Sequence, residues 1–396
     1  MSKPEKMINF DNTEIAFQGK TTLQLRKASF LFNAMSSQGL VKVGSSLLQK
    51  GYAWHLPLDL TMKSTIYAQF CGGESLIQCE PVVRDLEKYN IKAILDYSVE
   101  GSETVQSMQA AFEETLMAIS HAGADHNIAF AVFKPTAFIN KTVLIKASYG
   151  STYLKDDEKQ EIADFRSRVN TLASHAASLN IPLMIDAEDT YYQNFIDQVV
   201  TEMMQQYNTE KVIIYNTLQT YRHDRLQFLA DALNKAIAGN YKMGIKLVRG
   251  AYMEKERERA NQLCYPSPIF DTKEETDIDY DAAVAFCVEH IDRISLFNGT
   301  HNQHSCELLV QLMQDKGLQP NDNRIYFAQL YGMSDNLSYN LAAEGYNVAK
   351  YLPYGPVKQV IPYLIRRAEE NTAVAGQSNR ELNLIQTEIK RRKNKK

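Results

Sequence analysis

Eight short apolar runs, each followed by a longer stretch with helical periodicity, limit the fold of this sequence more than any other feature. The runs are KAILDYS (92–98), NIAFAVFKPT (127–136), PLMIDAE (182–188), KVIIYNTLQ (211–219), MGIKLVRGAY (243–252), RISLFNGTH (293–301), RIYFAQLYG (324–332) and NVAKYLPYG (347–355). They are nearly continuous in hydrophobicity, as strands buried on both faces are. Between them, stretches such as YDAAVAFCVEHI (280–291) repeat apolar residues at three- and four-residue spacing, which predicts helices. Another, SCELLVQLMQDKG (305–317), is predicted to begin at its serine and to end at its glycine.

Strands that alternate with crossover helices form parallel sheets, and two architectures share that local pattern. The count of eight favours an α/β fold with a closed (β/α)8, TIM-like barrel. A doubly wound open sheet is the alternative, but no GxGxxG motif follows the first run, as a dinucleotide-binding sheet would usually show. We therefore expect an N-terminal helical arm at 1–90, a barrel at 91–378 with a C-terminal helix over its mouth, and a basic C-terminal tail at 379–396.

Composition restricts the classes of function. The net charge of −4 argues against a nucleic-acid-binding surface, which normally has a basic excess. No apolar run reaches the roughly 18 residues of a membrane-spanning helix, and the N-terminus resembles neither a secretory signal nor a transit peptide. The five cysteines form no CxxC pair, which is typical of reduced thiols and gives no zinc signature. We expect a cytoplasmic protein without a nucleic-acid partner.

Polar residues gather at the ends of the runs, where the functional residues of such a barrel lie. They are Lys134, Asp186, Glu188, Gln219, Arg249, Thr300, His301, Asn302, Gln329 and Tyr351. Lys246 belongs with them, because alternation places Lys246 and Val248 on the strand face opposite to Arg249. On an edge strand Lys246 would simply reach water, but a closed barrel has no edge. Lys134 and Asp186 have a second interpretation, as a structural ion pair at the barrel mouth.

Motifs of several other enzyme classes are absent. No GxSxG, HExxH or GxxxxGK[ST] sequence occurs, which argues against the commonest hydrolases and nucleotidases. His301 and His304, in THNQH, have no acidic or cysteine ligand nearby in the sequence. We therefore interpret them as a loop histidine and a histidine at a helix start, and we expect no metal site.

The clearest anion-binding pattern lies in PYGPVKQVIPYLIRRAEEN (353–371), a predicted helix whose first turn would accommodate Pro362. Arg366 and Arg367 follow about one turn later and can flank a single groove. Two arginines in a closed pocket select a small carboxylic acid or a phosphate. The alternative is that both are solvated and pair with the glutamates that follow them.

Taken together, KLVRGAYMEKE, GTHN, AQLYGM, KYLPYGPV and YLIRRAEEN resemble the proline dehydrogenase family, in the family's motif order, over roughly residues 90–375. The resemblance implies a distorted (β/α)8 barrel that uses FAD to oxidise L-proline to Δ1-pyrroline-5-carboxylate. PSPIFDTKEETDIDYD (266–281) and PYGPV look most similar to the single-function, eukaryote-like branch, and nothing resembling an aldehyde dehydrogenase domain follows. The expected partners are therefore a quinone as electron acceptor and a separate pyrroline-5-carboxylate dehydrogenase.

Carried over residue by residue, the resemblance implies two sets of site residues. The cofactor set is Gln219, Lys246, Val248, Gly250, Ala251, Tyr252, Thr300, His301, Asn302, Gln329 and Glu370. The substrate set is Lys134, Asp186, Leu330, Tyr351, Arg366 and Arg367. Two positions depart from the family. Lys246 stands where many members have arginine. The glutamine of AQLYGM directly precedes the leucine, which turns Gln329 to the strand face opposite to Leu330.

Two alternatives to proline oxidation stay open. A family member that acts on hydroxyproline tends to have a smaller residue at the position of Tyr351, and a barrel of this kind could also bind a partner without catalysis. Electron transfer to a quinone implies an approach to the membrane, as a peripheral contact at its inner face. The basic segment IKRRKNKK (389–396) could assist that approach or could be a disordered, solubilising tail.

Overall fold

The computed structural model describes residues 8–54, 58–99, 104–373 and 377–395. Eight parallel strands follow one another in the order of a closed barrel, β1 to β8, so the predicted fold class is confirmed and the open sheet is wrong. The chain divides into two compact units. The split unit consists of Met1–Gly101 and Gln329–Lys396, and the central unit consists of Ser102–Ala328. The predicted boundaries at residues 90 and 378, and the helix over the barrel mouth, stay predictions.

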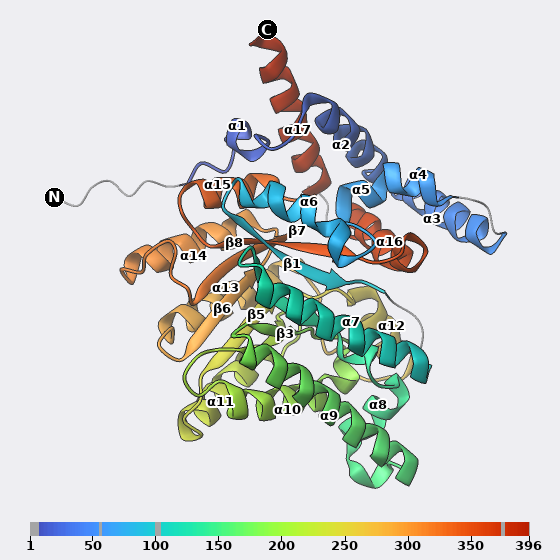
Figure 1. Cartoon of the computed structure of the whole chain (residues 1–396), viewed down its shortest axis with the longest axis vertical. Coiled ribbons are helices and arrows are strands. Elements are labelled where there is room, and N and C mark those ends of the chain that lie inside the picture. The colour runs from blue at the N-terminus through green and yellow to red at the C-terminus, as the bar shows by residue number, and fades with distance from the viewer. Residues whose placement is uncertain (1–7, 55–57, 100–103, 374–376, 396) are drawn as a thin grey trace. The chain divides into compact units, whose positions relative to one another are not determined.

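The central unit contains most of the strands and the helices that connect them. In chain order its elements are α7 (Val105–Ala124), β2 (Ile128–Phe133), η1 (Pro135–Ala137), α8 (Lys141–Tyr149), η2 (Ser151–Tyr153), α9 (Asp156–Ser178), β3 (Leu183–Ile185), α10 (Thr190–Tyr207), β4 (Ile214–Gln219), α11 (Arg225–Ala238), β5 (Met243–Val248), α12 (Met253–Gln262), α13 (Lys273–Glu289), β6 (Ile294–Gly299), α14 (Gln303–Asp315) and β7 (Ile325–Leu330), whose last two residues belong to the split unit. Helices α9, α10 and α11 lie outside the strands (Figure 1). Gln219 of β4 lies opposite Val248 of β5, and the ends of β2 and β3 also lie opposite each other, while β3 ends three residues before β4. The residues that follow these strands therefore start from one common edge.

Aromatic rings fill the interior between the strands of the central unit. The ring of Phe130 meets those of Tyr215, Phe297 and Tyr326 edge to face. The centroid distances are 5.3, 5.1 and 5.0 Å, within the range that aromatic pairs favour. Gly244 makes room for this cluster, because a Cβ there would lie 2.6 Å from the Tyr215 ring. Side chains two positions further along each strand point into the same interior, because the strand period is two.

The split unit joins the two ends of the chain. Its elements are α1 (Thr13–Ala16), α2 (Thr22–Met35), α3 (Gln38–Ala53), α4 (Asp59–Ser64), α5 (Ile66–Phe70), α6 (Leu76–Glu87), β1 (Ile91–Tyr97), α15 (Asp335–Ala343), β8 (Val348–Tyr354), α16 (Val357–Ala373) and α17 (Gln377–Asn394). Strand β1 pairs with β8, and α17 packs beside α2 (Figure 1). The hydrophobic core that joins these helices includes Leu25, Phe32, Phe70, Val360, Leu364 and Ile385.

Two helix starts differ from the prediction. Helix α16 begins at Val357, so Pro362 lies inside the helix and not in its first turn. The helix starts early because the Glu74 carboxylate accepts the N–H of Val357 at 3.3 Å. Helix α14 begins at Gln303, two residues before the predicted serine, because the side chain of Asn302 caps it. A cap supplied by the residue before the helix outweighs the helical preference of later positions.

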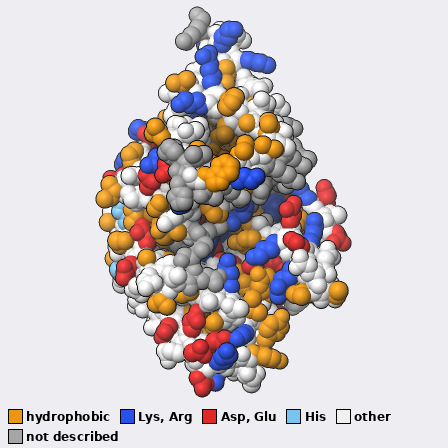
Figure 2. Space-filling view, turned by 90° about the vertical axis from the view of Figure 1, so that its right-hand side faces the viewer, with side chains coloured by type: hydrophobic (Ala, Val, Ile, Leu, Met, Phe, Trp, Pro, Cys, Tyr) orange, Lys and Arg blue, Asp and Glu red, His pale blue; other side chains and the backbone are white. Residues whose placement is uncertain are grey.

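The basic C-terminal segment is helical over the described residues and is not an unstructured tail. Arg391 and Arg392 of α17 donate to the carboxylate of Glu388 at 2.7 and 2.6 Å. Arg392 also donates to the carbonyl oxygens of Phe17 and Lys20, at 2.8 and 2.6 Å. The basic side chains at the end of α17 appear in blue at the top of Figure 2. Among the described residues, no helix is both long enough and apolar enough to cross a membrane.

Candidate active site

Three charged side chains meet at the strand ends of the central unit, and we call them the interior cluster: Lys134, Asp186 and Lys246. The Nζ of Lys246 lies 2.6 Å from one oxygen of Asp186, and the Nζ of Lys134 lies 3.2 Å from the other. Lys246 is 8% exposed and Asp186 is 14% exposed. The backbone N–H of Asp186 donates to the carbonyl oxygen of Phe133 at 3.0 Å, which continues the pairing of β2 and β3. The edge-strand interpretation of Lys246 is therefore wrong, because a carboxylate meets its ammonium group inside the barrel.

The charges of the interior cluster do not cancel. Burial by itself would raise the pKa of Asp186, but Lys246 and Lys134 outweigh this effect and hold that pKa below its ordinary value. The carboxylate is therefore ionised at neutral pH and faces two lysines, of which Lys134 also lies close enough to Glu188 to lower the pKa of that carboxyl. An excess positive charge in a shielded site attracts anions. A carboxylate with a lowered pKa is also a poor proton acceptor, which argues against Asp186 as a general base.

Gln219 connects the ends of three strands. It is 3% exposed, and its amide nitrogen donates to the carbonyl oxygen of Glu188 at 2.7 Å. Its amide oxygen accepts the N–H of Ala251 at 3.3 Å. The turn to Ala251 depends on Gly250, which has a φ of 137° and on which a Cβ would lie 2.6 Å from the ring of Tyr221. Only glycine therefore suits this position, for both backbone strain and space.

Glu188 is a residue of this region to which the sequence assigned no role. It is buried, and its carboxylate accepts the N–H and the hydroxyl of Thr136 at 2.9 and 2.5 Å. Burial raises the pKa of Glu188 to about 7, although the bonds from Thr136 and the charge of Lys134 act in the opposite direction. The signal available in the sequence was its position two residues after Asp186, which places both on one strand face if the strand continues.

Arg249 lies on the opposite face of β5 from Lys246 and joins the outer helices. Its guanidinium donates to the carboxylate of Asp277 at 2.5 Å and to the hydroxyls of Thr300 and Ser305 at 2.6 and 3.0 Å. It also stacks on the ring of Tyr280 at 4.2 Å. This cation is thus a structural tie between β5, α13 and the start of α14.

The turn after β6 contains three residues of the predicted cofactor set. The hydroxyl of Thr300 accepts the N–H of Asn302 at 3.0 Å, and the side chain of Asn302 caps α14. His301, between them, is partly buried. His304 is 77% exposed and its nearest carboxylate, that of Asp281, lies 3.7 Å away. Within the described residues, no three His, Cys, Asp or Glu side chains come close enough to hold a metal ion.

At the end of β7, in the split unit, the predicted residues Gln329 and Leu330 point to opposite faces of the strand. Because Tyr326 points into the interior, alternation turns Leu330 inward and Gln329 outward. Gln329 is 2% exposed and accepts the hydroxyl of Ser338, from α15, at 2.7 Å. The side chain of Gln329 therefore faces the helix layer, and its assignment to the cofactor stays a prediction. Tyr351 of β8 is 8% exposed.

Arg366 and Arg367 lie in α16 of the split unit and are both partly buried. The guanidinium of Arg367 lies 5.3 Å from the ring of Tyr363. Glu370 also belongs to α16, but its side chain lies outside the described part of the structure. The predicted residues thus divide between the two units. The central unit holds Lys134, Asp186, Gln219, Lys246, Val248, Gly250, Ala251, Tyr252, Thr300, His301 and Asn302, and the split unit holds the others. Convergence of the two sets stays a prediction.

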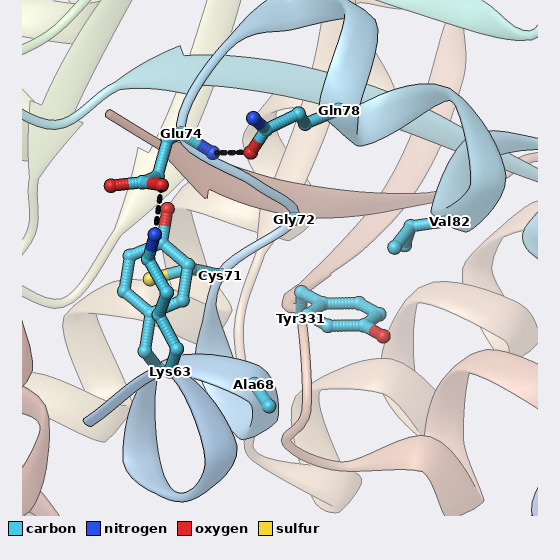
Figure 3. Close-up of a pocket in the computed structure, with 9 residues that line it drawn as sticks. Lys63, Ala68, Cys71, Gly72, Glu74, Gln78, Val82 and Tyr331 are labelled. Carbon is cyan, nitrogen blue, oxygen red and sulfur yellow. Dashed lines mark hydrogen bonds and ion pairs between the residues drawn. The ribbon is translucent and has the colours of Figure 1, made fainter. Parts of the chain in front are cut away.

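The split unit also contains a cavity of about 390 Å³. Lys63 and Glu74 form an ion pair on one side of it, while Val82 and Tyr331 lie on the other (Figure 3). The N–H of Glu74 donates to the side chain of Gln78 at 3.0 Å. No residue of the predicted cofactor and substrate sets lines this cavity.

A family model described as proline dehydrogenase matches residues 79–380. The chain belongs to the proline dehydrogenase family. A carbapenem antibiotics biosynthesis protein, CarD, from Pectobacterium carotovorum subsp. carotovorum is 36% identical over 332 residues, which cover 83% of this chain and 85% of that protein. Proline dehydrogenase 2, mitochondrial, from Arabidopsis thaliana is 32% identical over 438 residues, which cover 98% of this chain and 92% of that one. The Arabidopsis protein is named as mitochondrial, which differs from the cytoplasmic location that the sequence analysis predicts for this chain.

Among solved structures, proline utilization A from Bdellovibrio bacteriovorus matches with a TM-score of 0.71 at 19% identity. The match covers 92% of this chain and 38% of that protein. At this identity the likeness supports the fold alone.

The central unit fits the flavin on which proline dehydrogenase family members in general depend. FAD carries a negatively charged pyrophosphate. Lys134 and Lys246 of the interior cluster are cations of the kind that bind such a group. Gly250 and Ala251 also present backbone without bulky side chains at the end of β5. The chemistry of these groups therefore suits FAD.

Proposed function

We propose that this chain catalyses the first step of proline catabolism, the FAD-dependent oxidation of L-proline to Δ1-pyrroline-5-carboxylate. The observation that carries the proposal is the interior cluster: a buried and a partly buried lysine on one ionised carboxylate, at the strand ends of a proline dehydrogenase family barrel. In this proposal Gln219, Lys246, Val248 and the residues 250–252 and 300–302 hold the cofactor. The product passes to a separate pyrroline-5-carboxylate dehydrogenase.

In this proposal, cationic side chains hold the substrate carboxylate. Arg366 and Arg367 are adjacent on α16 and offer planar guanidinium groups that bind a carboxylate through two parallel hydrogen bonds. Lys134 adds a third cation, and Leu330 and Tyr351 form walls around the pyrrolidine ring. Holding the ring in one orientation converts a bimolecular encounter into an oriented, unimolecular step.

In the reaction, proline loses a hydride from the ring carbon next to nitrogen and a proton from nitrogen. FAD, when bound, would supply the hydride acceptor, and a quinone would be the final acceptor of the two electrons. The nitrogen must be neutral, because its lone pair stabilises the developing iminium. Asp186 is committed to Lys134 and Lys246 and has a lowered pKa, so we assign the amine proton to solvent. Lys246 favours negative charge beside it through direct attraction.

Delivery of electrons to a quinone requires an approach to the membrane. The arginines of α17 are engaged in ion pairs, so we assign this contact to another surface of the split unit. Large apolar side chains are exposed along α2, α3, α4 and the turn before α4. They are Leu23, Phe30, Leu40, Leu47, Trp54 and Leu60, with exposures of 61–80%. Leu23 and Phe30 are two turns apart on α2, as are Leu40 and Leu47 on α3, so each helix exposes an apolar face of the kind that marks protein or membrane contact.

A spectroscopic experiment on the purified protein tests the proposed function. The protein is expected to be yellow, and anaerobic L-proline is expected to bleach the flavin absorbance. A colourless protein that takes up no FAD, or a flavin that proline leaves oxidised, contradicts the proposal and supports a non-catalytic barrel.

Hydroxyproline is the second candidate substrate. Tyr351 is present as a full-sized, largely buried side chain, which favours the unsubstituted ring. Comparison of the bleaching rates with proline and with 4-hydroxyproline separates the two.

A further inference from the structure

The turn that follows β7 has a left-handed backbone conformation at Gly332, which glycine permits, and at Ser334, which serine does not favour. Gly332 has a φ of 76° and Ser334 a φ of 49°, and a left-handed conformation at a residue other than glycine costs energy. A Cβ at Gly332 would lie 1.9 Å from the carbonyl oxygen of Gln69. The carbonyl oxygen of Gly332 accepts the side-chain amide of Gln69 at 2.8 Å. Neighbouring elements therefore impose the shape of this turn.

Lys350 of β8 makes the main contacts that hold the turn. Its Nζ donates to the carbonyl oxygens of Met333 at 2.5 Å and Leu330 at 3.4 Å. The same Nζ lies 2.9 Å from the carboxylate of Asp335. An ammonium group has three N–H donors, so these three acceptors satisfy it. Lys350 is 1% exposed, and none of the steps proposed above uses it.

Two further groups complete this arrangement. Lys20, from the segment before α2, lies 2.8 Å from the other oxygen of Asp335 and is 23% exposed. Glu381 of α17 accepts the N–H of Ser334. We call Lys20, Asp335 and Lys350 the turn clamp. Lys350 donates to carbonyl oxygens of the turn, whereas within the described residues Lys20 contacts the carboxylate of Asp335 and no carbonyl oxygen of the turn.

The turn clamp connects two residues that the proposed function assigns to the substrate. Leu330 accepts a hydrogen bond from Lys350, and Tyr351 follows Lys350 directly in β8. The carbonyl oxygen of Tyr351 also accepts the N–H of Tyr331 at 2.8 Å. Lys350 and Tyr351 point to opposite strand faces, so Lys350 acts from the helix layer on a wall that faces the interior. Tyr331, in the same turn, lines the cavity of the split unit (Figure 3).

We propose that Lys350 is a positioning residue that fixes Leu330 relative to Tyr351 and thereby sets the width of the space for the substrate ring. The inference rests on the proposed function. It adds a specificity determinant that touches neither substrate nor cofactor, because the ammonium group acts only through the backbone of the turn.

The test compares Lys350→Met with the matched variant Lys20→Met. Both substitutions remove one cation from Asp335, so both are expected to lower the thermal midpoint. Only Lys350→Met releases the carbonyl oxygens of the turn. It is therefore expected to raise the KM for proline about 10-fold and to reduce discrimination against 4-hydroxyproline, because a misfit of about one methylene in a pocket has this size. Flavin content and kcat are expected to stay within about twofold of the wild type.

A double variant tests whether Lys350→Met changes the KM only because it impairs folding. In Lys350→Met with Asp335→Asn, no carboxylate that has lost one of its two lysines remains beside the new methionine, and the effect on KM is expected to persist. If the KM and the discrimination of the Lys350 variants match those of Lys20→Met, Lys350 is structural and the inference is wrong. If the wild type itself is not reduced by proline, the proposed function fails first, and the inference falls with it.

Discussion

The interior cluster and the turn clamp are built from the same parts, two lysines and one aspartate, but they occupy different places. In the turn clamp, Lys350 is 1% exposed and its remaining donors meet backbone carbonyl oxygens. In the interior cluster, Lys246 is 8% and Lys134 is 21% exposed, at the strand ends where barrel active sites lie. Buried charge alone therefore does not identify a site. The position of the charged residues at the strand ends, on the interior face, is what marks them as candidates for an active site.

Each set of charges also has a second carboxylate beside it with a raised pKa. Burial raises the pKa of Glu188 to about 7, next to Lys134. Burial also raises the pKa of Glu381, next to Lys350 and Asp335. In both places the protein keeps one carboxylate ionised and makes ionisation of its neighbour costly. Burial is the main cause in both cases, and a neighbouring carboxylate adds to it, Asp189 for Glu188 and Asp335 for Glu381.

The largest expected difference between the two sets is in stability. Asp335→Asn leaves Lys350 buried without its carboxylate, which typically costs about 3–5 kcal/mol of the free energy of unfolding. Asp186→Asn is expected to cost less, because Lys246 and Asp186 are 8% and 14% exposed, whereas Lys350 and Asp335 are 1% and 6% exposed. Urea denaturation of both variants measures this. The exposed Asp85→Asn, whose partner is Lys88, is the control and should cost less than about 1 kcal/mol. Equal losses for Asp335→Asn and Asp186→Asn would show that the two sets are energetically equivalent.

The next prediction separates the roles of the two units in binding. Arg366→Met removes a charged, two-point contact with the substrate carboxylate, so the KM for proline is expected to rise about 100-fold. Bound flavin is expected to stay, because the proposed cofactor residues lie mainly in the central unit. Arg380→Met, in α17 and paired with Asp11, is the control. Loss of flavin together with an unchanged KM would reverse the assignment of the arginines.

A pH series tests the second carboxylate of the central unit. The pKa of Glu188 rises from about 4.5 in the unfolded chain to about 7 in the folded one, so its contribution to stability is full below pH 4.5 and is lost as pH rises through 7. Glu188→Gln removes this loss. Its advantage in unfolding free energy over the wild type is therefore expected to grow by about 2 kcal/mol between pH 5 and pH 8. Thermal denaturation at both pH values, with the exposed Glu254→Gln as control, measures the difference. A constant offset between variant and wild type would mean that Glu188 does not titrate in this range.

The smallest expected effect concerns the wall of the substrate space. Tyr351→Ser removes a bulky ring, so the ratio of kcat/KM for 4-hydroxyproline to that for proline is expected to increase about threefold or more. Stopped-flow reduction of the flavin by each substrate gives both values. Equal discrimination by variant and wild type would refute the role of Tyr351, and with it one of the two residues that the turn clamp is proposed to align.

Much of the central unit follows from local sequence patterns. The eight apolar runs predict the strands, and alternation along MGIKLVRGAY predicts that Lys246 and Arg249 point to opposite faces. The structure has Lys246 on Asp186 and Arg249 on Asp277, one inside the strands and one among the outer helices. The offset in AQLYGM likewise predicts that Gln329 turns away from Leu330, and Gln329 meets Ser338 in the helix layer.

The sequence by itself thus determined the order of the strands, their faces and the polar residues at their ends, because periodicity depends on neighbours only a few positions apart. Tertiary structure decided which charges meet. Lys246 and Asp186 are 60 residues apart, and no local pattern connects them. The same holds for Glu74 at the start of α16, for the ion pairs that make the basic segment a packed helix, and for Lys350 beneath the turn. Each depends on contacts between distant segments, which exist only after the chain has folded.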